Sequence, residues 1–470
     1  MKTFHNVLIN TMISNVTTGF LFFALVFWIY LETHDVALTG IVSGVYMGLI
    51  ALSSIFFGTV VDHNRKKSVM VFSALITLLF YVLSAVVWVV WMDTSKLSTT
   101  YVPLWFFMSF IIIGSIVEHM RNIALSTVVT LLVPEAERDK ANGLVGAVQG
   151  VGFLVTSVIA GAAIGFLGME ATMWICVALS LVALIHLLPI KIAEPEIVTH
   201  TDAQAAVQEA TAHEEGEVAV PTAASDLSIV SKGIDLKGSM KIILSVPGLL
   251  ALILFASFNN LIGGVYSALM DPYGLELFSP QVWGLMLGLS SLGFIAGGGI
   301  ISKTGLGKNP VRTLLLVNLG VSFIGIFFTL REWWWLYVLG IFVFMAITPA
   351  AEAAEQTILQ RVVPFRQQGR VFGLAMAVEM AANPLSTVVV AIVADAYLIP
   401  WMEGAGADSI WGSILGSGDA RGMALMFVIA GFIMLIMVVL ALLSPSYRKL
   451  SAYYAASSQD IAEAAGSTTK

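Results

Sequence analysis

The sequence has a single cysteine and very little charge. Of its 470 residues, 11% are Asp, Glu, Lys or Arg and 58% are hydrophobic. Soluble domains carry about 25% charged residues, so this chain lacks the polar groups needed to cover a surface in water. The one cysteine, Cys176, excludes an intrachain disulfide and a cysteine metal cluster. We therefore predict an integral membrane protein, and we expect no metal site and no cofactor.

Basic residues are outnumbered as well. The net charge is -7, from 23 Lys and Arg against 30 Asp and Glu, so no nucleic-acid partner is expected. Nine of the acids fall within residues 190–241, where large apolar residues are few. Such a segment cannot bury a core, and we predict a mobile cytoplasmic linker with a short surface helix between Leu227 and Lys241.

Long apolar runs fill most of the remaining chain. A spanning helix needs about 20 apolar residues, and a helix satisfies its own backbone in lipid. Such runs occur at twelve places. The first six are 7–31, 36–61, 68–91, 102–131, 143–166 and 171–189. The second six are 246–270, 279–301, 311–330, 334–361, 371–398 and 422–444. The predicted fold is all-α, with two six-helix bundles (1–189 and 242–446) around a central cavity.

An even number of spans places both termini on one side of the membrane. If that side is the cytoplasm, all but four of the 23 Lys and Arg are cytoplasmic, because cytoplasmic loops retain positive charge. We predict a multi-pass protein of the cell (inner or plasma) membrane. Both termini are then cytoplasmic, with residues 447–470 as a polar, frayed tail, and we expect a monomer.

The two predicted bundles share an internal repeat. Gly44, Gly48 and Gly58 recur 240 residues later as Gly284, Gly288 and Gly298. A second block, from Val133 to Gln149, recurs 230 residues later from Val363 to Glu379. Two blocks in register indicate a true duplication. Parallel repeats of this kind are typical of transporters whose substrate site lies between the halves, near the membrane midplane.

The loop after the second span carries a charged motif. Gly58 is followed by Asp62 and then by Arg65, Lys66 and Lys67. This motif resembles the signature of the major facilitator superfamily, and the resemblance covers essentially the whole chain. Charges at a helix end can pair with a neighbouring helix in one conformation and separate in the other, so we predict a conformational latch here. The rule that loops retain positive charge explains the basic residues but not the aspartate.

Two further stretches indicate which branch of the superfamily the sequence resembles. Residues 360–364 and 369–373 are similar to the drug-efflux branch that includes macrolide-type and multidrug exporters. Gly143, Gly152 and Gly161 match the glycine spacing of antiporters of the superfamily, although Thr156 and Ser157 replace its Gly-Pro pair. Small residues let helices approach closely, so these glycines are predicted to mediate helix packing.

A charged side chain inside the membrane indicates a functional or structural role, since burying one costs at least about 2.5 kcal/mol. In the fourth span, Glu118, Arg121 and Asn122 are spaced to share one helix face. The tenth span holds Glu352 and Glu355 at the same spacing, and the eleventh holds Glu379. The repeat relates the fourth and tenth spans, so both polar faces are expected to point to the central cavity.

These charged groups are candidates for proton coupling, with the proton gradient as the energy source. A carboxylate that alternates between water and a nearby cation can take up and release a proton. Glu118→Gln is then expected to abolish gradient-driven transport and to leave the protein folded. The alternative is a static ion pair between Glu118 and Arg121 that only fixes helix packing.

Substrate contacts are predicted from polar and aromatic side chains on spans that line the cavity. They are Asn15, Thr18, Phe22, Gln149, Asn259, Asn260 and Tyr266. The first three are spaced to lie on one face of the first span. Walls of amides and aromatic rings with few charges favour an amphipathic small molecule.

Three functions follow from these observations. The first is proton-coupled efflux of lipophilic or amphipathic small molecules, and the second is a carrier of the same fold that imports, or moves lipids or metabolites. The third is a membrane enzyme. Because HExxH, GxSxG and P-loop motifs are absent from the sequence, we predict a transporter, with no catalytic residues.

Overall fold

The computed structural model describes residues 2–132, 138–192, 236–307, 309–363 and 365–455. Their regular elements are all helical, as the apolar runs predict. The N-terminal half contains α1 (Lys2–Thr33), α2 (Val36–His63), α3 (Lys66–Trp91), η1 (Thr94–Lys96), α4 (Val102–Leu132) and α5 (Arg138–Leu187). The C-terminal half begins with α7 (Leu236–Ser245), α8 (Leu249–Leu277), α9 (Pro280–Thr304), α10 (Pro310–Phe327) and α11 (Trp334–Val362). It continues with α12 (Phe365–Val393), η4 (Ala394–Leu398), α13 (Ile399–Glu403), α14 (Ile410–Leu415) and α15 (Asp419–Leu443).

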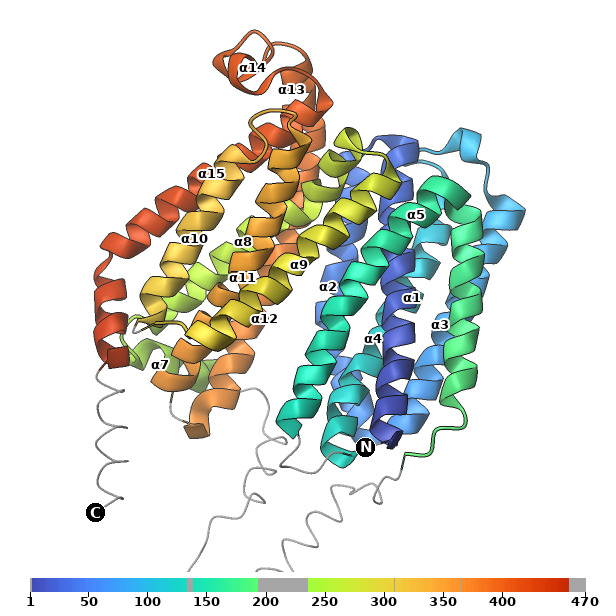
Figure 1. Ribbon diagram of the computed structural model, residues 1–470, viewed down its shortest axis with the longest axis horizontal. Helices are drawn as coiled ribbons and strands as arrows, with labels where there is room; N and C mark the ends of the chain where they lie inside the picture. The colour runs from blue at the N-terminus through green and yellow to red at the C-terminus, as the bar shows by residue number, and fades with distance from the viewer. Residues whose placement is uncertain (1, 133–137, 193–235, 308, 364, 456–470) are drawn as a thin grey trace, which may run out of the picture.

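Eleven of the described helices are long and apolar enough to cross a membrane. The longest, α5, has 50 residues and contains a non-helical residue, Gly168, with φ 76° and ψ 177°. Glycine adopts a positive φ without steric cost, so the chain reverses direction there. Figure 1 shows the two arms of α5 as antiparallel segments. They match the predicted spans 143–166 and 171–189, and the twelve predicted spans are thus all present.

The helices form two bundles that lie side by side in Figure 1. The start of α1 and the helix that ends the described chain, residues 445–455, lie at the same end of the molecule. We call this end the terminal face and the other end the opposite face. Figure 1 shows α5 and α9 side by side near the opposite face and diverging toward the terminal face.

Glycines bring the two bundles into backbone contact near the opposite face. A Cβ atom on Gly161 of α5 would lie 2.2 Å from the carbonyl oxygen of Pro280 and 2.9 Å from the Cα of Gly284 in α9. A Cβ on Gly44 of α2 would lie 2.5 Å from Val388 in α12. Gly44 and Gly284 are partners in the sequence repeat. Gly44 and Gly284 therefore allow close helix packing at two interfaces, α2 with α12 and α5 with α9.

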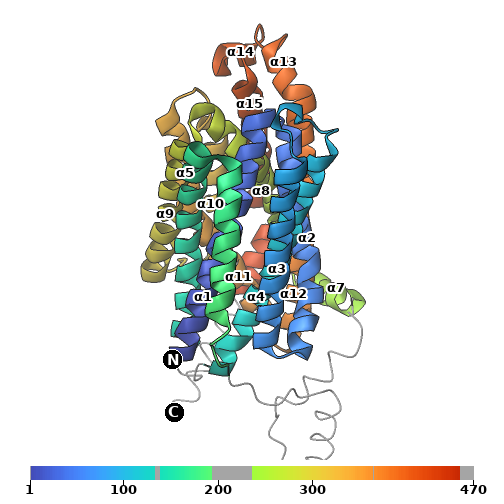
Figure 2. The same cartoon turned by 90° about the vertical axis from the view of Figure 1, so that its right-hand side faces the viewer.

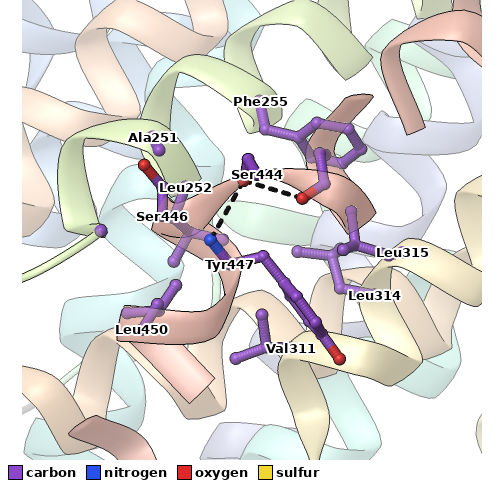
Figure 3. A pocket seen from close by; sticks show the side chains of 12 residues that line it. Ala251, Leu252, Phe255, Val311, Leu314, Leu315, Ser444, Ser446, Tyr447 and Leu450 are labelled. Carbon is purple, nitrogen blue, oxygen red and sulfur yellow. Dashed lines mark hydrogen bonds between the residues drawn. The ribbon is translucent and has the colours of Figure 1, made fainter. Parts of the chain in front are cut away.

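The structure corrects the prediction of a frayed tail over 447–470 for residues 447–455, whereas residues 456–470 lie outside the described residues. Residues 445–455 are helical, and Leu450 and Tyr454 are buried. Figure 3 shows Tyr447 and Leu450 over an apolar pocket of about 50 Å³ between the ends of α8, α10 and α15. The backbone N–H of Tyr447 donates to Ser444 Oγ at 3.1 Å and holds the turn that starts this helix. The chain stays ordered here because these side chains fill the end of the C-terminal bundle.

The surface helix begins later than the expected Leu227. α7 runs from Leu236 to Ser245, and most of the predicted linker lies outside the described residues. Two short helices that the apolar runs did not predict, α13 and α14, stand on the opposite face (Figure 1).

Candidate functional site

The buried charges of α4 lie inside the N-terminal bundle. Arg121 is fully buried, Glu118 is 3% exposed, and the two form an ion pair. Arg121 donates a hydrogen bond to Asn10 of α1, and Asn10 donates to the carbonyl oxygen of Ala183 in α5 at 2.7 Å. Ser73 of α3 lies 3.3 Å from the second carboxylate oxygen of Glu118. The pair therefore ties together α1, α3, α4 and the second arm of α5.

A cavity of about 10 Å³ adjoins this ion pair. Thr18, Thr77 and Ser180 line it together with Glu118 and Arg121. It has room for about one water molecule, which needs polar partners of this kind. The Nη2 atom of Arg121 has no hydrogen-bond partner among the described residues. The site is too small for an organic substrate.

A larger cavity, of about 260 Å³, lies on another side of α4. Its lining residues come from α1, α4 and α5 and are Met12, Asn15, Gly19, Phe23, Asn122, Gly152, Phe153 and Thr156. Asn15 donates to Asn122 Oδ1 at 2.9 Å. Residues 12–23 occupy the middle of α1, so the cavity lies near the middle of the membrane. None of the eight lining residues carries a charge.

This arrangement differs from the predicted common face of α4. Asn122 lines the larger cavity, whereas Glu118 and Arg121 line the small one inside the bundle. The difference arises because α4 packs against α1 and α3, and these helices supply polar partners for the two charges. The ion pair does not line the larger cavity.

The predicted substrate residues do not converge on one cavity. Asn15 lines the larger cavity and Thr18 the small one, whereas Phe22 stacks on Tyr46 with ring centroids 4.0 Å apart. Tyr266 is 7% exposed and stacks on Phe344 within the C-terminal bundle. It packs there because α8 turns this face toward its own bundle.

The other predicted substrate residues line neither of these two cavities or lie outside the described residues. Asn260 donates to the carbonyl oxygen of Ala256 in its own helix, and Asn259 beside it is partly exposed. The side chain of Gln149 lies outside the described residues, as does the environment of Gly143.

Two carboxyl groups of the C-terminal bundle contact each other. The carboxyl groups of Glu355 in α11 and Glu379 in α12 lie close to each other. Glu379 is 9% exposed, whereas Glu352, one turn before Glu355, is exposed. In the described part of the chain, no basic side chain forms an ion pair with any of these three acids.

Arg361 is the basic residue of α11 nearest to these acids in sequence, but its side chain binds a tyrosine. It donates to the hydroxyl of Tyr454 at 3.0 Å, and its guanidinium carbon lies 4.8 Å from the centre of that ring. Tyr454 belongs to the helix 445–455. Arg361 therefore does not supply a counter-ion to the carboxyl pair, and the side chains of Arg366 and Arg370 in α12 lie outside the described residues.

Comparison with known families identifies the architecture. The family model of the Major Facilitator Superfamily matches residues 7–387, most of the chain. The chain belongs to the Major Facilitator Superfamily. Members of this superfamily are transporters of small molecules rather than enzymes, as the sequence predicted. Their fold is that of secondary transport by alternating access, so this chain is a multi-pass membrane transporter.

Solved structures of three superfamily transporters are similar to the chain in fold. A nucleoside transporter has a TM-score of 0.65 at 12% identity, covering 94% of this chain and 100% of its own. A peptide transporter in complex with alafosfalin scores 0.62 at 14% identity, covering 96% and 95%. A D-xylose–proton symporter scores 0.60 at 13% identity, covering 92% and 97%. No curated protein matches the sequence.

The superfamily loop after α2 is only partly described. The environment of Gly58 and the side chain of Asp62 lie outside the described residues. Arg65 is exposed, Lys66 donates to the carbonyl oxygen of Val61, and Lys67 donates to that of Leu188 at 2.8 Å. The predicted latch at this loop remains a prediction.

The antiporter-like glycines of the superfamily have separate environments. Gly161 contacts the backbone of α9, as described above. A Cβ atom on Gly152 would meet only Val16, at 3.8 Å, so helix packing does not require glycine there.

Sequence reasoning missed a buried arginine near the opposite face. Arg421, predicted to lie outside the membrane, is 1% exposed. It donates to the hydroxyl of Tyr273 at 2.6 Å and forms an ion pair with Glu332 at 3.1 Å. The one available signal was its position two residues after Asp419, in the first turn of the apolar helix α15.

Proposed function

We propose that this transporter is a proton-coupled exporter of lipophilic or amphipathic small molecules. In this proposal Glu355 and Glu379 form its proton-binding site, and the cavity of about 260 Å³ forms part of its substrate site. The observation that carries the proposal is the proximity of these two carboxyl groups, neither of which forms an ion pair with a basic side chain in the described part of the chain.

Two ionised carboxylates that lie close together repel each other, and a nearby like charge favours the neutral form of a carboxyl group. The proximity of Glu355 and Glu379 therefore favours binding of a proton by one of them. Glu118 is in a different situation, since Arg121 already compensates its charge. Intramembrane carboxyl groups without a cation mark proton relays in transporters. The exposed Glu352, one turn away on the same side of α11, offers the pair a route to water.

The lining of the larger cavity supports the substrate class. Phe23, Phe153 and Met12 supply apolar surface, and the amides of Asn15 and Asn122 supply hydrogen-bonding groups. A site of this composition favours amphipathic ligands, because a small number of polar groups orients them on apolar walls. The similarity of residues 360–364 and 369–373 to drug exporters favours export. Import of a polar metabolite is the alternative, since the similar structures include a D-xylose–proton symporter.

Substrate-driven proton movement tests the proposal directly. The purified protein would be placed in liposomes with an internal pH dye and an imposed proton gradient. A lipophilic cation and a neutral amphiphile would be added in turn. We expect each to drive proton flux, and we expect Glu355→Gln and Glu379→Gln to reduce that flux to the level of protein-free liposomes.

Asp93→Asn is the matched control, because Asp93 is a carboxylate on an exposed loop that pairs only with Lys96, at 2.8 Å, and with Ser95. Its flux should equal that of the wild type. Full coupling in both glutamate variants would refute the carboxyl pair as the proton site. Substrate movement without proton movement would instead establish a uniporter.

A further inference from the structure

Two polar contacts join the bundles at the opposite face, beyond the glycine packing. The hydroxyl of Tyr30, near the end of α1, donates to Glu276 of α8 at 2.8 Å. His34 Nδ1 lies 3.6 Å from the same carboxylate oxygen. Tyr30 and His34 belong to the N-terminal half and Glu276 to the C-terminal half. This contact must therefore break when the two halves separate at this face.

The second contact is a helix cap supplied by the other half. The carboxylate of Asp395 accepts a hydrogen bond from the backbone N–H of Val36 at 3.2 Å. Asp35, in the same half as α2, accepts from Leu38 at 2.6 Å. The first N–H groups of a helix have no partner within the helix, and its dipole favours a negative charge at that end. Asp395 therefore completes the start of α2 only while the halves are together.

The backbone around Asp395 is specialised for this contact. Residues Ala394–Leu398 form a single π-helical turn at the end of α12. Such turns are rare and occur mostly at functional sites, because the wider turn changes the direction of the side chains that follow. Figure 2 shows the start of α2 near the orange segment that leads into α13. The sequence repeat gives no equivalent of this turn in the described N-terminal half.

We propose that Glu276 and Asp395 form a latch that holds the opposite face closed, and that both contacts must release for this face to open. Opening would return each partner to water, so each hydrogen bond has only a modest net strength. A latch of modest strength suits a transporter that must populate both states. The glycine contacts determine how closely the two halves can approach. The two carboxylates determine the fraction of molecules in which the opposite face is closed. The proposal does not depend on the transported substrate or on proton coupling.

Distance measurements between spin labels at the opposite face test this latch. Lys96 and Arg331 are exposed there on different halves and would be replaced by cysteines. The native Cys176 is fully buried and does not compete for the label. In wild-type protein in lipid nanodiscs, a short distance should dominate. Tyr30→Phe and Asp395→Ala should each raise the population at the longer distance about fivefold, the effect of losing one hydrogen bond.

In the double variant Tyr30→Phe with Asp395→Ala, the population at the longer distance should rise about 25-fold. The two effects should multiply because the contacts share no atoms. Glu32→Gln is the control, because it removes an exposed negative charge from the same end of α1 without touching either contact. It should keep the wild-type distribution. Unchanged distances in the double variant would overturn the latch. Equal shifts in Glu32→Gln would overturn it too, because they would show that only the net charge of this face matters.

Discussion

Replacing Gly161 by alanine is expected to abolish transport while leaving the protein folded in the membrane. The new Cβ would lie 2.2 Å from the carbonyl oxygen of Pro280 and 2.9 Å from the Cα of Gly284. Both atoms belong to backbone, so no side-chain rotation relieves the contact. Forced overpacking of this kind costs about 3 kcal/mol. That cost would lower the population closed at the opposite face by roughly 100-fold. The N-terminal bundle itself loses no contact and should fold normally.

The consequence for transport follows from alternating access. A protein that cannot close one face cannot expose its site to the other, because the two faces open in turn. The spin-label pair at Lys96 and Arg331 should show mainly the longer distance, and substrate flux in liposomes should fall by the same factor. Gly298→Ala is the matched control on α9, since a Cβ there meets nothing within 4 Å. Wild-type flux in Gly161→Ala would show that α5 and α9 can separate without loss of function.

The fold was predictable because its determinants are local. Twelve apolar runs place twelve spans, and the positive-φ Gly168 forms the turn between the two arms of α5. The duplicated glycines were visible in the sequence at a constant spacing. Their partners were not, because helix spacing alone does not say which neighbour a glycine face meets.

The candidate site was less predictable because it depends on how each helix is rotated in its bundle. The positions of Glu118, Arg121 and Asn122 along α4 give their relative angles but not the side that faces the cavity. Tyr266 illustrates the same limit on α8. The contacts at the opposite face were missed altogether, since Tyr30 and Glu276 lie 246 residues apart and Val36 and Asp395 lie 359 apart.

Arg361 shows how a distant segment changes the meaning of a local pattern. Along α11, Arg361 stands six residues from Glu355 and nine from Glu352, beyond the spacing of three or four residues at which helix side chains pair. Its partner is Tyr454, which belongs to a segment whose composition predicted a frayed tail. The sequence spacing along α11 therefore could not identify the partner of Arg361.

Removal of the charge of Glu118 is expected to destabilise the N-terminal bundle before it affects coupling. Glu118→Gln leaves the guanidinium of Arg121 fully buried without a counter-ion. Breaking a buried pair by removing one partner costs about 3–5 kcal/mol, because the remaining charge stays desolvated. The four segments joined by this network should loosen together. This expectation replaces the one drawn from the sequence, in which Glu118→Gln remained folded.

Thermal unfolding in detergent measures this effect. Glu118→Gln should lower the unfolding temperature clearly, whereas the double variant Glu118→Gln with Arg121→Met should recover most of the loss. The recovery is expected because replacing both partners removes the uncompensated charge, and methionine fills much of the volume of arginine. If Glu118→Gln unfolds at the wild-type temperature and loses proton-coupled flux, the ion pair is not structural. Glu118 would then take the role of proton carrier that we assign to the pair of Glu355 and Glu379.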